Sequence, residues 1–287
     1  MKRIITVILT IALAAAFMPG VSSGQAKITT KKVKLSDFTT KTTRVVLAGS
    51  EIFNNTLKEE ISRRWMISPY EFCSLEEYEA TKNSTNYYFL IPVSSRFKKE
   101  AEPGIIVLSL VKGGEAEASS ADKEGFEVMS IPCAATDSQS GREFVFLPAL
   151  IDIIQRYMSE AMISDRVSYG GLAGFTVGKM LKERDKKIVF SADDLASTAA
   201  AGDDWEARNM TLMDEDDADE LFTAGTANTL VSFTVSPIEP RKGSVCYKMI
   251  ISADTHELCY FDKHQIKGNG AGFQPLDLKA IALPRKK

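Results

Sequence analysis

One order of strands and helices occurs twice in this chain, and this repetition constrains the fold more than any other feature. In the first half, the strand pattern Val45–Ala48 is followed by a helical stretch and then by an alternating strand that begins at Asn86. In the second half, Ile188–Phe190 and Asn228 open the matching strands. Ile188 lies 142 positions after Val46 of the first strand, and Asn228 lies 142 positions after Asn86. The pattern therefore predicts two related units that arose by internal duplication.

Each unit has the expected order β-α-β-α-β-β-β, which predicts mixed sheets and places the chain in the α+β class. In the first unit an apolar residue recurs at every fourth position from Phe53 to Trp65, so these side chains form one helix stripe that faces a core. Ser74 and Glu77 then have the spacing of a capping box. In the second unit we expect a helix of small residues at Leu195–Ala201, and Asp214 with Asp217 at the corresponding cap positions.

A long amphipathic helix is predicted between the two units. The apolar run that begins at Phe144 leads into it, and Pro148 is expected near its first turn. Apolar side chains, Leu150 among them, form a broad face, while Asp152 and Arg156 lie on the polar face. We expect this helix to be buried between or beneath the two sheets.

The amino terminus predicts an exported protein. Lys2 and Arg3 precede an apolar stretch, Ile4–Phe17, and small residues follow up to Ala26. A membrane anchor is the alternative, but the stretch is shorter than the roughly 20 residues that a spanning helix needs. Cleavage is therefore expected after Gly24 or Ala26, because each has a small residue two positions before it.

The mature protein is expected in the periplasm or the extracellular space, and not as a lipoprotein, because the first cysteine, Cys73, lies far from the cut. No later apolar run is long enough to span a bilayer. Without Lys2 and Arg3, 33 basic residues remain against 38 acidic residues, a formal charge of −5. This balance argues against nucleic-acid binding, which normally requires a clustered basic excess.

The predicted domain organisation has six segments. About 260 mature residues exceed what one small core usually covers, which favours two domains. The segments are a signal peptide at 1–26, a lead-in at 27–43, a first unit with the long helix at 44–168, a glycine-rich and charged connector at 169–186, a second unit at 187–267 and a C-terminal arm at 268–287. We expect a solvated lead-in or an edge strand, and an arm that docks through its apolar residues.

Four cysteines in an exported protein permit disulfides, but their spacing lacks the density of a disulfide-stapled small fold, so mostly buried free thiols are expected. Cys246 and Cys259 flank a hairpin whose turn centres near Asp254 and Thr255. This turn sets Cys246 opposite Lys263, so a direct bridge between the two cysteines would need a bulge or a shifted turn.

No set of residues predicts a cofactor, a metal site or a catalytic centre. The only histidines are His256 and His264, which on one extended strand would lie about 26 Å apart and could not share a metal. Asp262 shares the strand face of His264 and would be its partner in an acid/base pair; the alternative is a solvated or structural histidine. A Gly-Lys pair at 178–179 suggests a phosphate loop, but Met180 replaces the hydroxyl residue that would hold magnesium.

Aromatic residues on strands are the best indication of a binding surface. Tyr88 lies between two other aromatic residues, and Tyr260 lies on the last hairpin. Alternation along a strand exposes one set of side chains, and exposed aromatic patches mark interaction sites. Tyr88, Tyr260, Asp262 and His264 are therefore the binding candidates, together with the sheet edges and the long polar loop Lys112–Gly125.

In element order alone, each unit resembles the amino-terminal domains of envelope proteins such as TolB, a resemblance that covers topology and transfers no functional residue. The style of the chain also resembles exported proteins of Gram-negative bacteria. We therefore predict an exported, non-enzymatic binding or scaffold protein of the bacterial cell envelope, whose partner is an envelope protein or another macromolecule. A structural subunit of a larger assembly is a third possibility. The alternative is a periplasmic hydrolase-like enzyme with its site between the two units.

Overall fold

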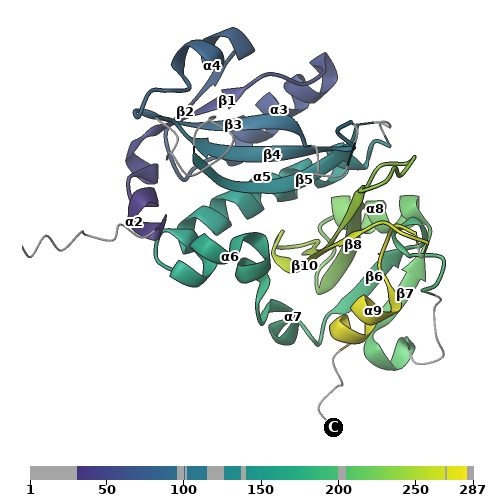
Figure 1. Ribbon diagram of the computed structural model, residues 1–287. Coiled ribbons are helices and arrows are strands. Elements are labelled where there is room, and N and C mark those ends of the chain that lie inside the picture. Colours follow the sequence, from purple (N-terminus) through teal and green to yellow (C-terminus); the bar gives the residue numbers. More distant parts are fainter. Residues whose placement is uncertain are drawn as a thin grey trace, which may run out of the picture. The chain divides into compact units, whose positions relative to one another are not determined.

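The computed structural model describes residues 31–95, 100, 102–114, 126–136, 140–199, 205–268 and 270–282 (Figure 1). The predicted signal peptide and most of the 112–125 loop lie outside these residues. The first sheet has the strand order β2-β1-β3-β4-β5. β1 is parallel to β2 and β3, whereas β4 is antiparallel to both of its neighbours, β3 and β5. The strands are β1 (Thr42–Val46), β2 (Tyr70–Cys73), β3 (Tyr87–Ser95), β4 (Ile105–Lys112) and β5 (Phe126–Ala135).

The second sheet has the order β7-β6-β8-β9-β10, with the same sequence of parallel and antiparallel pairs. Its strands are β6 (Lys187–Ser191), β7 (Met210–Met213), β8 (Thr229–Val235), β9 (Val245–Ser252) and β10 (Leu258–Gln265). The first residues of corresponding strands lie 145, 140, 142, 140 and 132 positions apart. The chain thus has helices and two mixed five-stranded sheets, which confirms the α+β class.

Helices cover both faces of the first sheet. α3 (Glu51–Arg64) connects β1 to β2, and its apolar stripe ends at Trp65, which is buried in the main core as the spacing predicts. α4 (Leu75–Thr81) connects β2 to β3 and begins with the expected capping box. Its Tyr78 packs in a separate cluster with Val46, whereas Val45 belongs to the main core. Successive side chains of β1 therefore point to opposite faces, and the two helices lie on opposite sides of the sheet.

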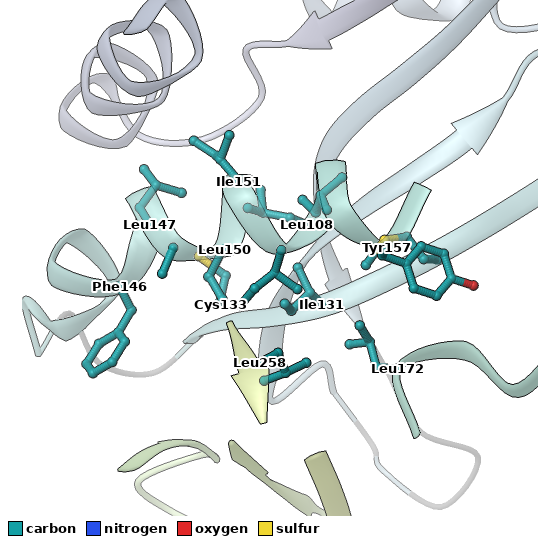
Figure 2. Packing of buried hydrophobic residues seen from close by; sticks show 14 of the residues in the cluster. Leu108, Ile131, Cys133, Phe146, Leu147, Leu150, Ile151, Tyr157, Leu172 and Leu258 are labelled. Atoms are coloured by element: carbon teal, nitrogen blue, oxygen red, sulfur yellow. The ribbon is translucent and has the colours of Figure 1, made fainter. Parts of the chain in front are cut away.

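The long helix α5 (Arg142–Ala161) belongs to a core that includes side chains from both sheets. Figure 2 shows Leu147, Leu150 and Ile151 of this helix in the same cluster as residues of β4 and β5 and Leu258 of β10. The helix begins earlier than expected, after Gly141 in the left-handed conformation, so Pro148 lies in its second turn rather than near the first. Buried residues lie on most of its circumference, because it is covered on more than one side.

The lead-in was predicted to be solvated or an edge strand, and this is wrong for its described part. It forms the short helices α2 (Lys31–Leu35) and η1 (Phe38–Thr40). Leu35 and Phe38 are fully buried, and the ring of Phe38 lies edge-on to Tyr88 at 4.8 Å between centroids. Burial of two large apolar side chains outweighs the polar composition of this segment.

Asp37 fastens the lead-in to the first sheet, since it accepts hydrogen bonds from Tyr88 Oη at 2.6 Å and Lys112 Nζ at 2.9 Å. Burial raises the pKa of the Asp37 carboxyl, but hydrogen bonds from Lys41, Tyr88 and Lys112 outweigh burial and lower the pKa to about 2. A carboxyl whose folded-state pKa is depressed stabilises the fold above its unfolded-state value, and this stability is lost as the pH falls through the folded-state value.

We expect Asp37→Asn to be less stable than the wild type at pH 7 and to lose less stability between pH 4 and pH 2, because the ionised partner is absent at every pH. Urea midpoints across this range measure the difference. Asp165→Asn is the control, since Asp165 has an ion pair with Lys32 in which both side chains remain substantially exposed. Parallel pH profiles for the wild type and Asp37→Asn would contradict the expectation.

The segment 169–186, expected to be a glycine-rich connector, lies largely in two helices. These are α6 (Asp165–Thr176) and α7 (Lys179–Lys182). α6 is interrupted at Gly171, whose φ of 57° falls in the region that glycine adopts without a steric penalty. Leu172 and Phe175 of α6 are buried in the main core, and this packing explains why a glycine-rich stretch is helical.

One local prediction for the second unit is wrong, and another is right only in position, since Asp214 is the N-cap residue of its helix but makes no capping hydrogen bond. No α-helix occupies the described part of Leu195–Ala201, where η2 (Ala192–Asp194) is followed by a single parallel bridge between Leu195 and Phe273; the rest lies outside the described residues. That pairing uses backbone groups that a helix would need. η3 (Glu206–Arg208) then leads into β7. α8 (Glu215–Thr223) begins after Asp214, whose side chain makes no capping hydrogen bond.

All four cysteines are buried and free, which confirms the expectation of free thiols. The predicted register of the last hairpin is wrong by one residue over most of its length. Leu258 pairs with Ile251 as the turn predicts, but a bulge before Tyr260 shifts the pairing by one residue. Cys246 therefore lies opposite His264 and not opposite Lys263.

The C-terminal arm contains α9 (Pro275–Ile281), which packs on the second sheet on the side away from α5. Leu278 and Ile281 are buried there, next to Phe273. No helix in the described part of the chain combines the length and the apolar character needed to cross a bilayer.

Candidate functional site

The first sheet has a cavity at the carboxyl ends of β1 and β3. From β1 the chain passes to β2 by a helix on one face and returns to β3 by a helix on the other face. In open α/β sheets, a crevice forms where the connections leave in opposite directions, and ligands bind there. The cavity has a volume of about 150 Å³ and is lined by Ala48, Gly49, Ser50, Phe53, Pro92, Ser94, Ile106, Ala134, Ala135, Thr136, Glu143 and Phe144. We call it the first cavity.

The loop after β1 is held rigidly against this cavity. The side-chain amide of Asn54 accepts a hydrogen bond from the backbone N–H of Gly49 at 3.0 Å and donates one to its carbonyl at 2.9 Å. A Cβ atom at Gly49 would lie 2.8 Å from Cδ1 of Phe53, so glycine allows the loop to approach the helix. The hydroxyl of Ser50 accepts from the backbone of Phe53 and caps α3.

The second sheet has a cavity at the corresponding place, beyond the carboxyl ends of β6 and β8. Its volume is about 140 Å³. Its lining consists of Cys133, Ala134, Ala135, Ser140, Arg142, Glu143, Asp193, Asp194, Glu215, Phe233, Thr234, Val235, Ser236 and Ile238. We call it the second cavity. Ala134, Ala135 and Glu143 line both cavities, so the two lie side by side at the amino end of α5.

A buried charge network forms the wall of the second cavity. Arg142 donates from Nη1 to Asp194 at 3.0 Å and from Nη2 to Asp219 at 2.9 Å. Asp194 also accepts hydrogen bonds from the hydroxyl of Ser232 at 2.6 Å and from the backbone N–H of Thr234 at 3.0 Å. Arg142 and Asp194 are almost fully buried, and their charge-assisted hydrogen bonds connect the start of α5 to the second sheet.

One positive charge is shared among three carboxylates in this network. Burial alone would lower the pKa of the Arg142 guanidinium, but Asp194, Asp219 and Glu215 raise it above its ordinary value. Burial raises the pKa of Asp219, and the nearby Asp194 adds to this effect although Arg142 opposes it. Burial likewise raises the pKa of Glu215. The wall of the second cavity thus has an excess of negative charge.

A third cavity of about 100 Å³ adjoins the first two. It is lined by Glu102, Pro103, Gly104, Thr136, Pro237, Glu239, Arg241 and Ser244. It shares Thr136 with the first cavity, and its residues Pro237 and Glu239 alternate along the chain with Ser236 and Ile238 of the second. An ion pair between Arg241 and Glu102 closes its rim.

The four binding candidates predicted from the sequence do not meet at these cavities. Tyr88 is fully buried, and burial together with its hydrogen bond to Asp37 raises its pKa; its ring belongs to the core and not to a binding surface. Tyr260, Asp262 and His264 alternate along β10, and none of them lines a cavity. Their polar atoms contact Asp277, Lys248 and the carbonyl of Gly270, respectively.

The linings of the three cavities contain hydroxyl groups and the thiol of Cys133, but no histidine. Burial raises the pKa of Cys133 to about 12, so this thiol is protonated and a poor nucleophile at neutral pH. Within the described ranges, no group of three His, Cys, Asp or Glu side chains is placed to hold a metal ion.

Sequence reasoning did not identify Arg142, Glu143 and Asp194. Only their positions in the chain could have indicated them: Asp194 follows the end of a buried strand, and Arg142 follows a glycine at the start of the longest of the described helices. Polar residues just after parallel strands are candidates for a site, but only the fold shows which strands meet. No family model, no curated protein and no solved structure matches this chain.

Proposed function

We propose that this protein is an exported, non-enzymatic binding protein of the cell envelope, and that it holds an extended segment of a partner protein in the three adjoining cavities. The observation that carries the proposal is that corresponding edges of both sheets supply adjoining cavities, which meet at Ala134, Ala135 and Glu143. Export rests on the amino-terminal sequence alone. The matching strand orders support an origin by duplication, which would have produced the two adjoining cavities from one ancestral crevice.

The sizes of the cavities favour a chain segment over a compact small molecule. Pockets for drug-sized ligands usually enclose 300–1,000 Å³ in one space. Here a space of about 150 Å³ shares lining residues with each of two others, of about 140 and 100 Å³, an arrangement that suits successive side chains of an extended segment.

The charge of the linings favours a basic segment. The residues of the three cavities include two guanidinium groups, Arg142 and Arg241, and both are paired with carboxylates. They also include six carboxylates, Glu102, Glu143, Asp193, Asp194, Glu215 and Glu239. A lysine or arginine side chain of the partner would therefore meet complementary charge at this rim.

Site-specific photo-cross-linking in native envelopes tests the proposal. A benzoylphenylalanine at position 238, where Ile238 lines the second cavity and is 65% exposed, is expected to give one discrete protein adduct. The same probe in place of Ile163, which is 78% exposed and lines none of the three cavities, is the control and should give no such adduct.

A blocking variant makes the test specific. Ala135→Trp places a large ring at the junction of the first two cavities and should abolish the adduct. Ala173→Trp, on the exposed side of α6, should leave it unchanged. An adduct that survives Ala135→Trp, or that forms equally from position 163, would disprove binding in the cavities.

A hydrolase-like enzyme is the second candidate, and one observation favours it. Glu215 lines the second cavity between the two sheets with a raised pKa, a property of general acids. In that case the captured segment would be cleaved, and Glu215→Gln would stop cleavage without reducing capture. Intact-mass analysis of the adduct distinguishes the enzyme from the binding protein.

A further inference from the structure

We infer that the C-terminal segment Gly270–Ala282, here called the strap, holds Asp194 in position and so controls the shape of the second cavity. Figure 1 shows its helix α9 next to β6 and β7 of the second sheet. The importance of this control for partner binding rests on the proposed function, whereas the mechanical connection itself does not.

The strap forms backbone hydrogen bonds with the loop that carries Asp194. The N–H of Phe273 donates to the carbonyl of Asp194 at 2.7 Å, and the N–H of Ala196 donates to the carbonyl of Phe273 at 3.1 Å. The ring of Phe273 is fully buried and lies edge-on to Phe190 of β6 at 5.2 Å between centroids. The loop that carries Asp194 is therefore paired with the strap on one side.

The strap approaches this loop so closely that only glycine fits at position 272. A Cβ atom there would lie 2.6 Å from the carbonyl oxygen of Asp194 and 2.7 Å from the amide nitrogen of Ala196. Gly272 also has a φ of 90°, which side-chain-bearing residues rarely adopt. Its N–H donates to Sγ of Cys246 at 3.2 Å, so the docked strap also covers this thiol.

A buried ion pair fastens the other end of the strap. Lys248 on β9 is 1% exposed, and its Nζ lies 2.7 Å from both carboxylate oxygens of Asp277. The hydroxyl of Tyr260 donates to the same carboxylate at 2.8 Å. Burial raises the pKa of Asp277, but the hydrogen bonds from Lys248, Gln274 and Tyr260 outweigh it and lower the pKa. The ionised pair thus holds the strap to the sheet at neutral pH.

Asp194 connects the strap to the cavity because its backbone carbonyl and its side-chain carboxylate have different partners. Its carbonyl accepts from the strap, while its carboxylate accepts from Arg142, Ser232 and Thr234 in the cavity wall. Displacement of the carbonyl therefore moves the carboxylate away from these donors. In this way, release of the strap would loosen the wall of the second cavity.

Gly272→Ala in the full chain tests the inference with two readouts that need no partner. The first is the alkylation rate of Cys246, measured by mass spectrometry with iodoacetamide. The second is hydrogen exchange at the amide of Thr234, which donates to Asp194. Both rates are expected to rise by about 10-fold or more, because local opening exposes both groups. Gly268→Ala is the matched control, since a Cβ there meets nothing within 4 Å, and should change neither rate.

Asp277→Asn is a second, milder variant that keeps the test valid if the glycine variant unfolds. Slow exchange at Leu108, in the first sheet, would show that the fold is intact. Faster alkylation of Cys246 with unchanged exchange at Thr234 would overturn the inference, because the strap would then be free without moving Asp194. Unchanged rates at both positions in a folded Gly272→Ala would overturn it as well.

The proposed function can fail without affecting these readouts. If the strap controls the cavity and the cavity binds a partner, the adduct from position 238 decreases in Gly272→Ala. If no adduct forms even in the wild type, the proposed function is wrong, whereas the rates at Cys246 and Thr234 still decide the inference.

Discussion

Replacing Leu150 with aspartate is expected to abolish folding at 37 °C. Leu150 is fully buried on α5 within the core that includes residues of both sheets (Figure 2). A carboxylate at this position would have to lose its hydration without gaining a partner, and the cavity beside the shorter side chain would add to the cost. The loss should exceed about 5 kcal/mol, which is comparable with the whole free energy of unfolding of an ordinary domain.

Circular dichroism during thermal and urea unfolding measures this effect. Leu150→Met is the control for packing alone and should cost less than about 1.5 kcal/mol, because the volume is nearly conserved. Ile163→Asp introduces the same charge just after α5, at an exposed position, and should change stability by no more than about 0.5 kcal/mol. An unchanged melting temperature for Leu150→Asp would refute the burial of this helix between the sheets.

Arg142→Met has the second largest expected effect, a loss of about 3–5 kcal/mol in the free energy of unfolding. Methionine fills much of the same volume, so the loss arises from the buried carboxylate of Asp194 and the partly buried carboxylate of Asp219, which remain without their cation. Urea unfolding at pH 7 measures it. Arg156→Ala removes a more exposed ion pair with Glu257 from the same helix and should cost no more than about 1 kcal/mol.

The pH dependence of this variant identifies the cause. The folded-state pKa of Asp219 is raised already in the wild type, and loss of Arg142 would raise it further. A carboxyl with a raised folded-state pKa destabilises the fold above that value, and the cost decreases as the pH falls towards its unfolded-state value. The stability gap between Arg142→Met and the wild type should therefore be smaller at pH 5 than at pH 7. A constant gap would indicate lost packing instead of unpaired charge.

The elements that the sequence predicted well are those in which periodicity and burial agree within one segment. The stripe that ends at Trp65 and the capping box of Ser74 and Glu77 both depend on residues within a few positions of each other. The small-residue segment after Leu195 failed for the opposite reason. Its backbone bonds with Phe273, which is 78 positions away, and local propensity contains no information about such a partner.

The predicted binding residues failed for the same reason, because their exposure depends on distant segments of the chain. Alternation predicts that one face of each strand is exposed, but it cannot show what a distant segment later covers. Tyr88 is covered by the lead-in helices, and Tyr260 with His264 is covered by the strap. Hairpin pairing was likewise predicted to within one residue, because a bulge near Cys259 leaves no trace in the hydrophobic pattern.

From the sequence by itself, the α+β class and the repeated strand order could be predicted, since these follow from local periodicity, whereas the free state of the four thiols was decided by the structure. The tertiary structure alone decided which residues form the candidate site. Arg142 meets Asp194 and Asp219 across 52 and 77 positions, and the strap meets the same Asp194 from the end of the described chain. Such contacts depend on how separate elements pack, because a buried charge is stable only where the fold brings its partner within hydrogen-bond distance. The repeated order of strands therefore predicts the two sheets, while their packing around the start of α5 brings the cavities of the two sheets side by side.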